Sequence, residues 1–85
     1  MRRKVLIVED DPEFREMLAK LLELEGFNVV TVGNCIKAFS LFYTQHPNVV
    51  VTDLGLPDLS GFELIRWARE KEEFADLPII AISAY

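Results

Sequence analysis

Cysteine is nearly absent from this sequence. Its one cysteine, Cys35, cannot form a disulfide within the chain, and cysteine usage of this kind is typical of a reducing compartment. Cys35 lies among helix-forming residues, so we expect a small packed side chain rather than a reactive thiol.

Long apolar runs are absent as well. The first apolar run, Val5–Val8, follows basic residues but is ended at once by the acidic residue Glu9. It is too short for the apolar segment of a signal peptide and far too short to span a membrane. We therefore expect a cytoplasmic protein that makes no membrane contact.

Basic residues are scarce. Lys and Arg number 9 against 14 Asp and Glu, which gives a formal net charge of −5. Direct nucleic-acid binding by this chain is therefore not expected, because phosphate contacts need clustered Lys and Arg. Hydrophobic residues make up 51% of the 85 residues, which is enough for the packed core of one small domain over residues 1–85.

What the sequence does contain is a regular alternation of short apolar runs and amphipathic stretches. The apolar runs predict strands over residues 5–8, 29–32, 49–53 and 78–83. They are nearly continuous rather than alternating, which is typical of a parallel sheet covered by helices on both faces. The predicted fold class is α/β, an open sheet whose ligands bind outside the carboxyl ends of the strands.

Capping residues predict where the three helices begin and end. The first begins after Asp11, with Pro12 at its first position, and ends at Gly26. The second lies between Asn34 and Pro47, and the third runs from Ser60 to about Lys71. The apolar faces expected to point inward are Ile36, Phe39, Phe42 and Tyr43 in the second helix and Phe62, Ile65 and Ala68 in the third.

Polar side chains follow three of the predicted strands. Glu9 and Asp10 follow the first strand, Asp53 ends the third, and Ser83 ends the fourth. If the first and third strands are neighbours, their carboxylates gather at one edge, where like charges raise one another's pKa. A hard cation with oxygen ligands, such as Mg²⁺, would relieve that repulsion. Asp11 is expected to cap the first helix only.

A plainer interpretation exists for each of these residues taken singly. Acidic residues after a strand often cap the next helix or lie solvated in a turn, and a hydroxyl at a strand end is ordinary. Asp53 is harder to explain in this way, because it follows three valines and a buried carboxylate is costly without a partner.

The sequence resembles the receiver domain of bacterial two-component response regulators. The matching motifs are Val5–Asp11 for the first strand and its acidic residues, Val51–Gly61 for the phosphoacceptor strand and its loop, and Leu77–Ala84 for the fourth strand. The resemblance covers the whole chain. It implies a flavodoxin-like open parallel sheet with strand order 2-1-3-4 and helices on both faces.

The resemblance also implies roles for the site residues. Asp53 would accept a phosphoryl group from a histidine kinase or phosphotransfer protein, and Ser83 would be the switch hydroxyl. Asp10 would be the main Mg²⁺ ligand, with support from Glu9, Asp53 and the backbone carbonyl of Gly55. The chain would then be a Mg²⁺-dependent, self-phosphorylating signalling domain that controls an output domain, not a turnover enzyme.

One departure from the family pattern concerns the end of the chain. The family continues into a fourth helix, a fifth strand with a lysine, and a fifth helix, whereas this sequence ends at Tyr85, which is not the family's switch aromatic. We therefore expect an incomplete receiver domain. Its first helix would expose part of the face formed by Phe14, Leu18 and Leu21, and its fourth strand would be a free edge, so self-association is expected.

Two other functions compete with phosphoacceptor signalling. A truncated or degenerate receiver could act as a protein-interaction module that is never phosphorylated. A phosphatase of the haloacid dehalogenase type also uses an aspartate after a parallel strand, but it needs a second carboxylate two residues later, where this chain has Gly55.

Overall fold

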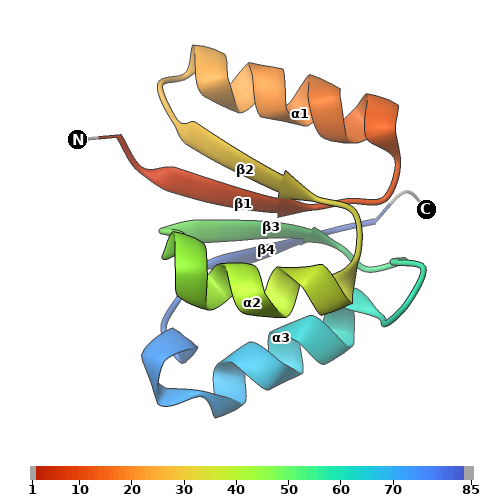
Figure 1. Cartoon of the computed structure of the whole chain (residues 1–85), viewed down its shortest axis with the longest axis vertical. Helices are drawn as coiled ribbons and strands as arrows, with labels where there is room; N and C mark the ends of the chain where they lie inside the picture. Colours follow the sequence, from red (N-terminus) through yellow and green to blue (C-terminus); the bar gives the residue numbers. More distant parts are fainter. Residues whose placement is uncertain (1, 84–85) are drawn as a thin grey trace.

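The computed structural model describes residues 2–83 and contains one parallel sheet. Its strands are β1 (Lys4–Val8), β2 (Asn28–Val32), β3 (Val49–Asp53) and β4 (Ile79–Ile82), which lie side by side in the order β2-β1-β3-β4 (Figure 1). This confirms the α/β class and the strand order that the resemblance implied. Residues 84–85, and with them the interpretation of Tyr85, lie outside the described part.

Helices cover both faces of the sheet. One face carries α1 (Pro12–Leu24), and the other carries α2 (Cys35–Gln45) and α3 (Gly61–Glu70) (Figure 1). A short 3₁₀ helix, η1 (Glu72–Phe74), precedes β4 and was not predicted. Because side chains alternate along a strand, β1 contributes Val5 and Ile7 to the α1 side and Leu6 and Val8 to the other.

The predicted capping residues fix the helix ends. The Asp11 carboxylate accepts a hydrogen bond from the Glu13 amide, and Asn34 and Ser60 cap α2 and α3 in the same manner. After α1, Gly26 takes a φ of 97°, a conformation that favours glycine. The strand and helix boundaries agree with the predicted ones to within about two residues, as expected for element ends.

The predicted inward faces of two helices were partly wrong. Phe62 and Ile36 are exposed, with 61% and 62% of their surface accessible. In α3 the buried residues are Gly61, Leu64 and Ala68. The amide of Gly61 donates to the Leu54 carbonyl at 3.0 Å, so the helix begins against the end of β3 and Phe62 points outward. In α2, the buried residues are Cys35, Ala38 and Phe42, and Tyr43 is exposed.

The helix α1 and the strand β4 are the least covered elements. No residue of α1 is fully buried; Phe14 and Leu18 are half-buried, while Leu21 is 53% exposed. Among residues 2–83, β4 pairs only with β3, and Ile80 on it is 54% exposed. None of the helices in this described part is long and apolar enough for a membrane span.

Candidate metal centre at the carboxyl edge of the sheet

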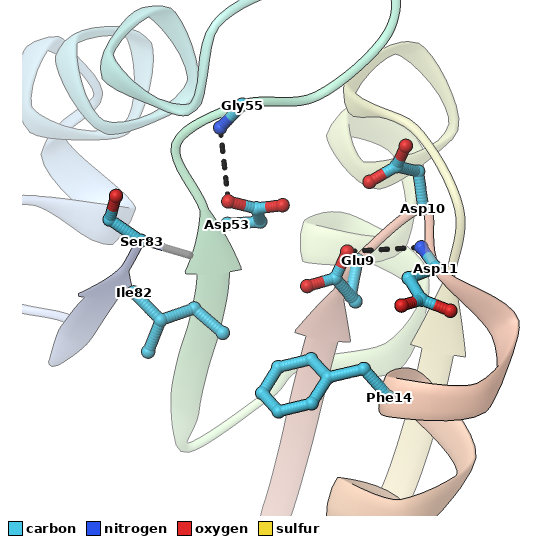
Figure 2. Close-up of a pocket in the computed structure, with 8 residues that line it drawn as sticks. All are labelled: Glu9, Asp10, Asp11, Phe14, Asp53, Gly55, Ile82 and Ser83. Carbon is cyan, nitrogen blue, oxygen red and sulfur yellow. Dashed lines mark hydrogen bonds between the residues drawn. The ribbon is translucent and has the colours of Figure 1, made fainter. Parts of the chain in front are cut away.

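Parallel pairing of β1 with β3 brings three carboxylates together. Val8 lies opposite Thr52 in the register, so the residues that follow in each strand, Glu9 and Asp53, are neighbours. One carboxylate oxygen from each of Glu9, Asp10 and Asp53 lies within 4.8 Å of the other two. The predicted convergence of acidic side chains is therefore present, and Figure 2 shows all three among the residues that line one pocket.

The pocket has a volume of about 500 Å³ and combines an acidic centre with two apolar walls. Phe14 of α1 and Ile82 of β4 form those walls (Figure 2). Ser83 and Gly55 line it as well, on the Asp53 side, so every residue predicted for the site borders one cavity. Asp11 also lines the pocket, but its carboxylate is engaged in capping α1.

Glu9 is the most deeply placed of the carboxylates, with only 5% of its surface exposed. Its side chain accepts a hydrogen bond from the Asp11 amide at 3.0 Å, and its backbone carbonyl accepts one from the Arg15 guanidinium at 2.9 Å. Burial raises the pKa of Glu9 above its usual value, and the neighbouring Asp10 and Asp53 raise it further. The metal-free site therefore disfavours the full set of negative charges.

Asp53 is held by the turn that follows it. Its Oδ1 accepts a hydrogen bond from the Gly55 amide at 3.0 Å, which fixes the plane of the carboxylate beside the pocket. Thr52, which is buried, donates its hydroxyl to the Asp53 carbonyl at 3.1 Å. Asp53 as a whole is half-buried and lines the pocket, so its neighbours orient a side chain that borders the cavity.

The chemistry of the donors fits one class of metal ion. The cluster offers only carboxylate oxygens, and neither sulfur nor imidazole nitrogen belongs to it. Oxygen-only sites with few carboxylates suit Mg²⁺, which keeps several of its waters. Asp10 is exposed and Glu9 is buried, so the site has one side open to solvent and one side closed.

Two residues beside the site were not predicted from the sequence. Arg15 holds the carbonyl of Glu9, and Asp58 hydrogen-bonds the amides of Cys35 and Ile36 at the start of α2. Arg15 looks like any other charged residue on an amphipathic helix, and Asp58 looks like a loop residue. The Arg15 contact joins residues six apart in the sequence and the Asp58 contacts join residues 22 and 23 apart, and neither separation is part of a helix or strand pattern.

The family of the chain is shown by comparison with known proteins, and its parallel sheet with acidic residues at the ends of β1 and β3 agrees with that family. The family model of the response regulator receiver domain matches residues 5–85, and the chain belongs to this family. Receiver domains are signalling domains of two-component systems, bind Mg²⁺ at an acidic pocket, and interact with histidine kinases or phosphotransfer proteins.

Relatives by sequence match nearly the whole chain. An uncharacterized 14.6 kDa protein of Leptolyngbya boryana is 41% identical over 81 residues, which cover 95% of this chain and 62% of that protein. The polar-differentiation response regulator DivK of Brucella ovis is 31% identical over 85 residues, covering 100% of this chain and 69% of DivK. The chain thus spans less than two thirds of the length of the first relative and slightly more than two thirds of the length of the second.

Solved structures agree closely in fold. The chemotaxis response regulator CheY4 of Vibrio cholerae has a TM-score of 0.91 at 26% identity, over 95% of this chain and 68% of CheY4. The response regulator TrrA of Thermotoga maritima, in complex with Mg²⁺–BeF, has a TM-score of 0.90 at 32% identity, over 98% of this chain and 70% of TrrA.

Proposed function

We propose that Asp53 accepts a phosphoryl group from a histidine kinase or phosphotransfer protein, with Mg²⁺, and that this event switches a downstream output in the cytoplasm. The observation that carries the proposal is the gathering of Glu9, Asp10 and Asp53 within 4.8 Å at the ends of β1 and β3. The domain is modified once for each signal, so we do not propose turnover of a substrate.

Each residue that the sequence predicted for the site has a place in this mechanism. A carboxylate oxygen of Asp53 forms a bond to phosphorus while the bond from phosphorus to the donor's imidazole nitrogen breaks, leaving an acyl phosphate on Asp53. Asp10, Glu9, Asp53 and the carbonyl of Gly55 would hold Mg²⁺, which would offset negative charge on the transferring group. The Ser83 hydroxyl, beside the same pocket, would then donate to a phosphoryl oxygen.

Three further observations support the proposal. The pocket is large enough for a phosphoryl group and a hydrated cation, since its volume is about 500 Å³. TrrA, which shares the fold at 32% identity, was solved with Mg²⁺–BeF. The raised pKa of Glu9 also fits a site whose negative charge is balanced only when a cation is present.

Phosphoryl uptake tests the proposal. We expect the chain to gain about 80 Da when it is incubated with Mg²⁺ and acetyl phosphate, because the donor transfers one phosphoryl group. Intact-mass spectrometry measures the gain, and a chelator added before the donor should prevent it. A chain that never gains this mass would instead support the alternative function, a protein-interaction module without phosphorylation.

We further propose that the 85-residue chain associates with a second copy through β4 and the outer face of α1. Ile80 on β4 and Leu21 on α1 are both more than half exposed, at 54% and 53%. An uncovered strand edge offers unpaired backbone groups to another chain. We expect sedimentation to show an average mass that rises with protein concentration. The Ile80→Lys variant should show a smaller rise, because a charge at this strand disfavours the association. A monomer throughout the micromolar range would contradict the proposal.

A further inference from the structure

The loop between β3 and α3, residues 54–60, carries Gly55, and several contacts hold its first residues. The Gly61 amide, at the start of α3, donates to the Leu54 carbonyl at 3.0 Å. The Gly55 amide donates to Asp53 at 3.0 Å, and Leu56 is buried in the core shared with α2 and α3. These contacts hold residues 54–56, and they do not involve the outer part of the loop, residues 57–60.

Asp58 holds the outer part of the loop against the start of α2. Its Oδ1 accepts hydrogen bonds from the amides of Cys35 and Leu59, each at 2.9 Å, and its Oδ2 accepts one from Ile36 at 2.8 Å. Cys35 and Ile36 are the first two residues of α2, where unpaired amides and the helix dipole favour a negative charge. One exposed carboxylate therefore joins the loop to a helix that is 22 residues or more away in the sequence.

Capping of α2 does not account for this arrangement by itself. The helix already has its own cap, because the Asn34 side chain accepts a hydrogen bond from the Lys37 amide at 2.9 Å. Although burial opposes it, the bonds from Cys35 and Ile36 hold the pKa of Asp58 below its usual value. The carboxylate is thus charged at neutral pH and bound across two segments rather than within one.

We propose that Asp58 is a positioning residue for the metal centre: by tying residues 57–60 of the loop to α2, it adds to the contacts that hold the backbone of Gly55, so that the Gly55 carbonyl can reach the cation. The inference rests on the proposed function, in which Gly55 contributes that carbonyl. It assigns a role to a residue that lies outside the pocket and contacts none of its carboxylates. Groups that orient metal ligands typically affect metal affinity by 10–100-fold, so the effect should be measurable.

The test compares two variants that each remove one cap from α2. Asp58→Ala removes the bonds from Cys35 and Ile36, and Asn34→Ala removes the bond from Lys37. Both should lower the midpoint of thermal unfolding by a few degrees. Calorimetric titration with Mg²⁺ alone should show affinity reduced roughly tenfold in Asp58→Ala and changed less than twofold in Asn34→Ala. Asp58→Asn, which keeps an oxygen acceptor, should recover part of the loss.

The outcomes separate this inference from the proposed function. Equal Mg²⁺ affinity in the unaltered chain and in a folded Asp58→Ala variant overturns the role of Asp58 alone. An equal loss of Mg²⁺ affinity in Asn34→Ala also overturns the role of Asp58, because the loss would then be caused by a less stable α2 and not by the loop. A failure of the unaltered chain to bind Mg²⁺ overturns both the inference and the metal centre on which it rests.

A measurement on the unaltered chain keeps the inference testable if Asp58→Ala does not fold. We expect Mg²⁺ to slow hydrogen exchange at the amides of Cys35 and Ile36, because fixing Gly55 also fixes the loop that carries Asp58. The amide of Lys37 is bonded to Asn34 in the same helix and provides the internal control. If Mg²⁺ left the exchange of Cys35 and Ile36 unchanged, or slowed all three amides equally, Asp58 would not link the loop to the site.

Discussion

Replacing Gly61 by Ala should destabilise the fold by about 3 kcal/mol, a large effect for one methyl group. A Cβ at this position would overlap the carbonyl oxygen of Asp53 and lie 2.9 Å from the Cα of Leu54. Both obstacles are backbone atoms at the end of β3, so no side chain can rotate away to make room. Either α3 must move off the sheet or the end of β3 must shift, and each change displaces Asp53. Urea unfolding of the two chains measures the loss.

The matched control for this prediction is Gly55→Ala. A Cβ at position 55 would meet only Asp53 Oδ1, at 3.9 Å, which is an ordinary contact. The variant keeps the backbone amide that donates to Asp53 and the carbonyl assigned to Mg²⁺, so its stability should change by less than about 1 kcal/mol. Equal destabilisation by the two substitutions would show that glycine at position 61 is not required by the close approach of α3.

Replacing Glu9 by Gln should stabilise the metal-free chain at neutral pH while weakening its response to Mg²⁺. Burial and the nearby Asp10 and Asp53 raise the pKa of Glu9, which means that the folded state disfavours the ionised side chain. A glutamine removes that charge and keeps an oxygen to accept the Asp11 amide. We expect a gain of about 0.5–1 kcal/mol without metal. Saturating Mg²⁺ should raise the unfolding midpoint of the unaltered chain more than that of the variant.

The gain in stability should depend on pH in a defined direction. In the unfolded chain Glu9 titrates near its ordinary pKa of 4.5, and in the folded chain it titrates at higher pH. Below 4.5 the residue is protonated in both states, so the variant and the unaltered chain should differ little. As the pH rises through the raised pKa, the folded state is penalised and the advantage of the glutamine develops fully. Unfolding experiments across this range measure the difference.

Glu16→Gln is the control for removing one negative charge at a position outside the pocket. Glu16 is exposed on α1, outside the pocket, so its substitution should leave both the metal-free stability and the Mg²⁺ response nearly unchanged. A Glu9→Gln variant that is less stable at neutral pH, or that responds to Mg²⁺ like the unaltered chain, would contradict the charge repulsion inferred at the site.

The sequence was sufficient to predict the four strands, the three α-helices and most of their ends, but not the 3₁₀ helix η1. Continuous apolar runs predict buried parallel strands, and residues such as Asp11 and Gly26 act through local backbone chemistry that a sequence records directly. The convergence of Glu9 with Asp53 is different, because it requires β1 and β3 to be neighbours. Periodicity does not reveal strand order, and the order came from the resemblance to the receiver family.

The errors and omissions have a common physical cause, which is contact between distant segments. Phe62 was expected inside because it is large and apolar, yet α3 is oriented by the close approach of Gly61 to the end of β3. Asp58 reads as a turn residue, yet its partners, Cys35 and Ile36, lie in another helix. Close approach of two backbones and hydrogen bonds across the chain leave no periodic signal in a sequence.

The most direct measurement compares phosphoryl uptake in two aspartate variants of the same pocket. Asp53→Asn removes the proposed phosphoacceptor, whereas Asp11→Asn alters a carboxylate that lines the same cavity but caps α1, a role that asparagine also fills. With Mg²⁺ and acetyl phosphate, intact-mass spectrometry should show the gain of about 80 Da in Asp11→Asn and none in Asp53→Asn. Undiminished uptake by Asp53→Asn would contradict the assignment of Asp53 as the phosphoacceptor.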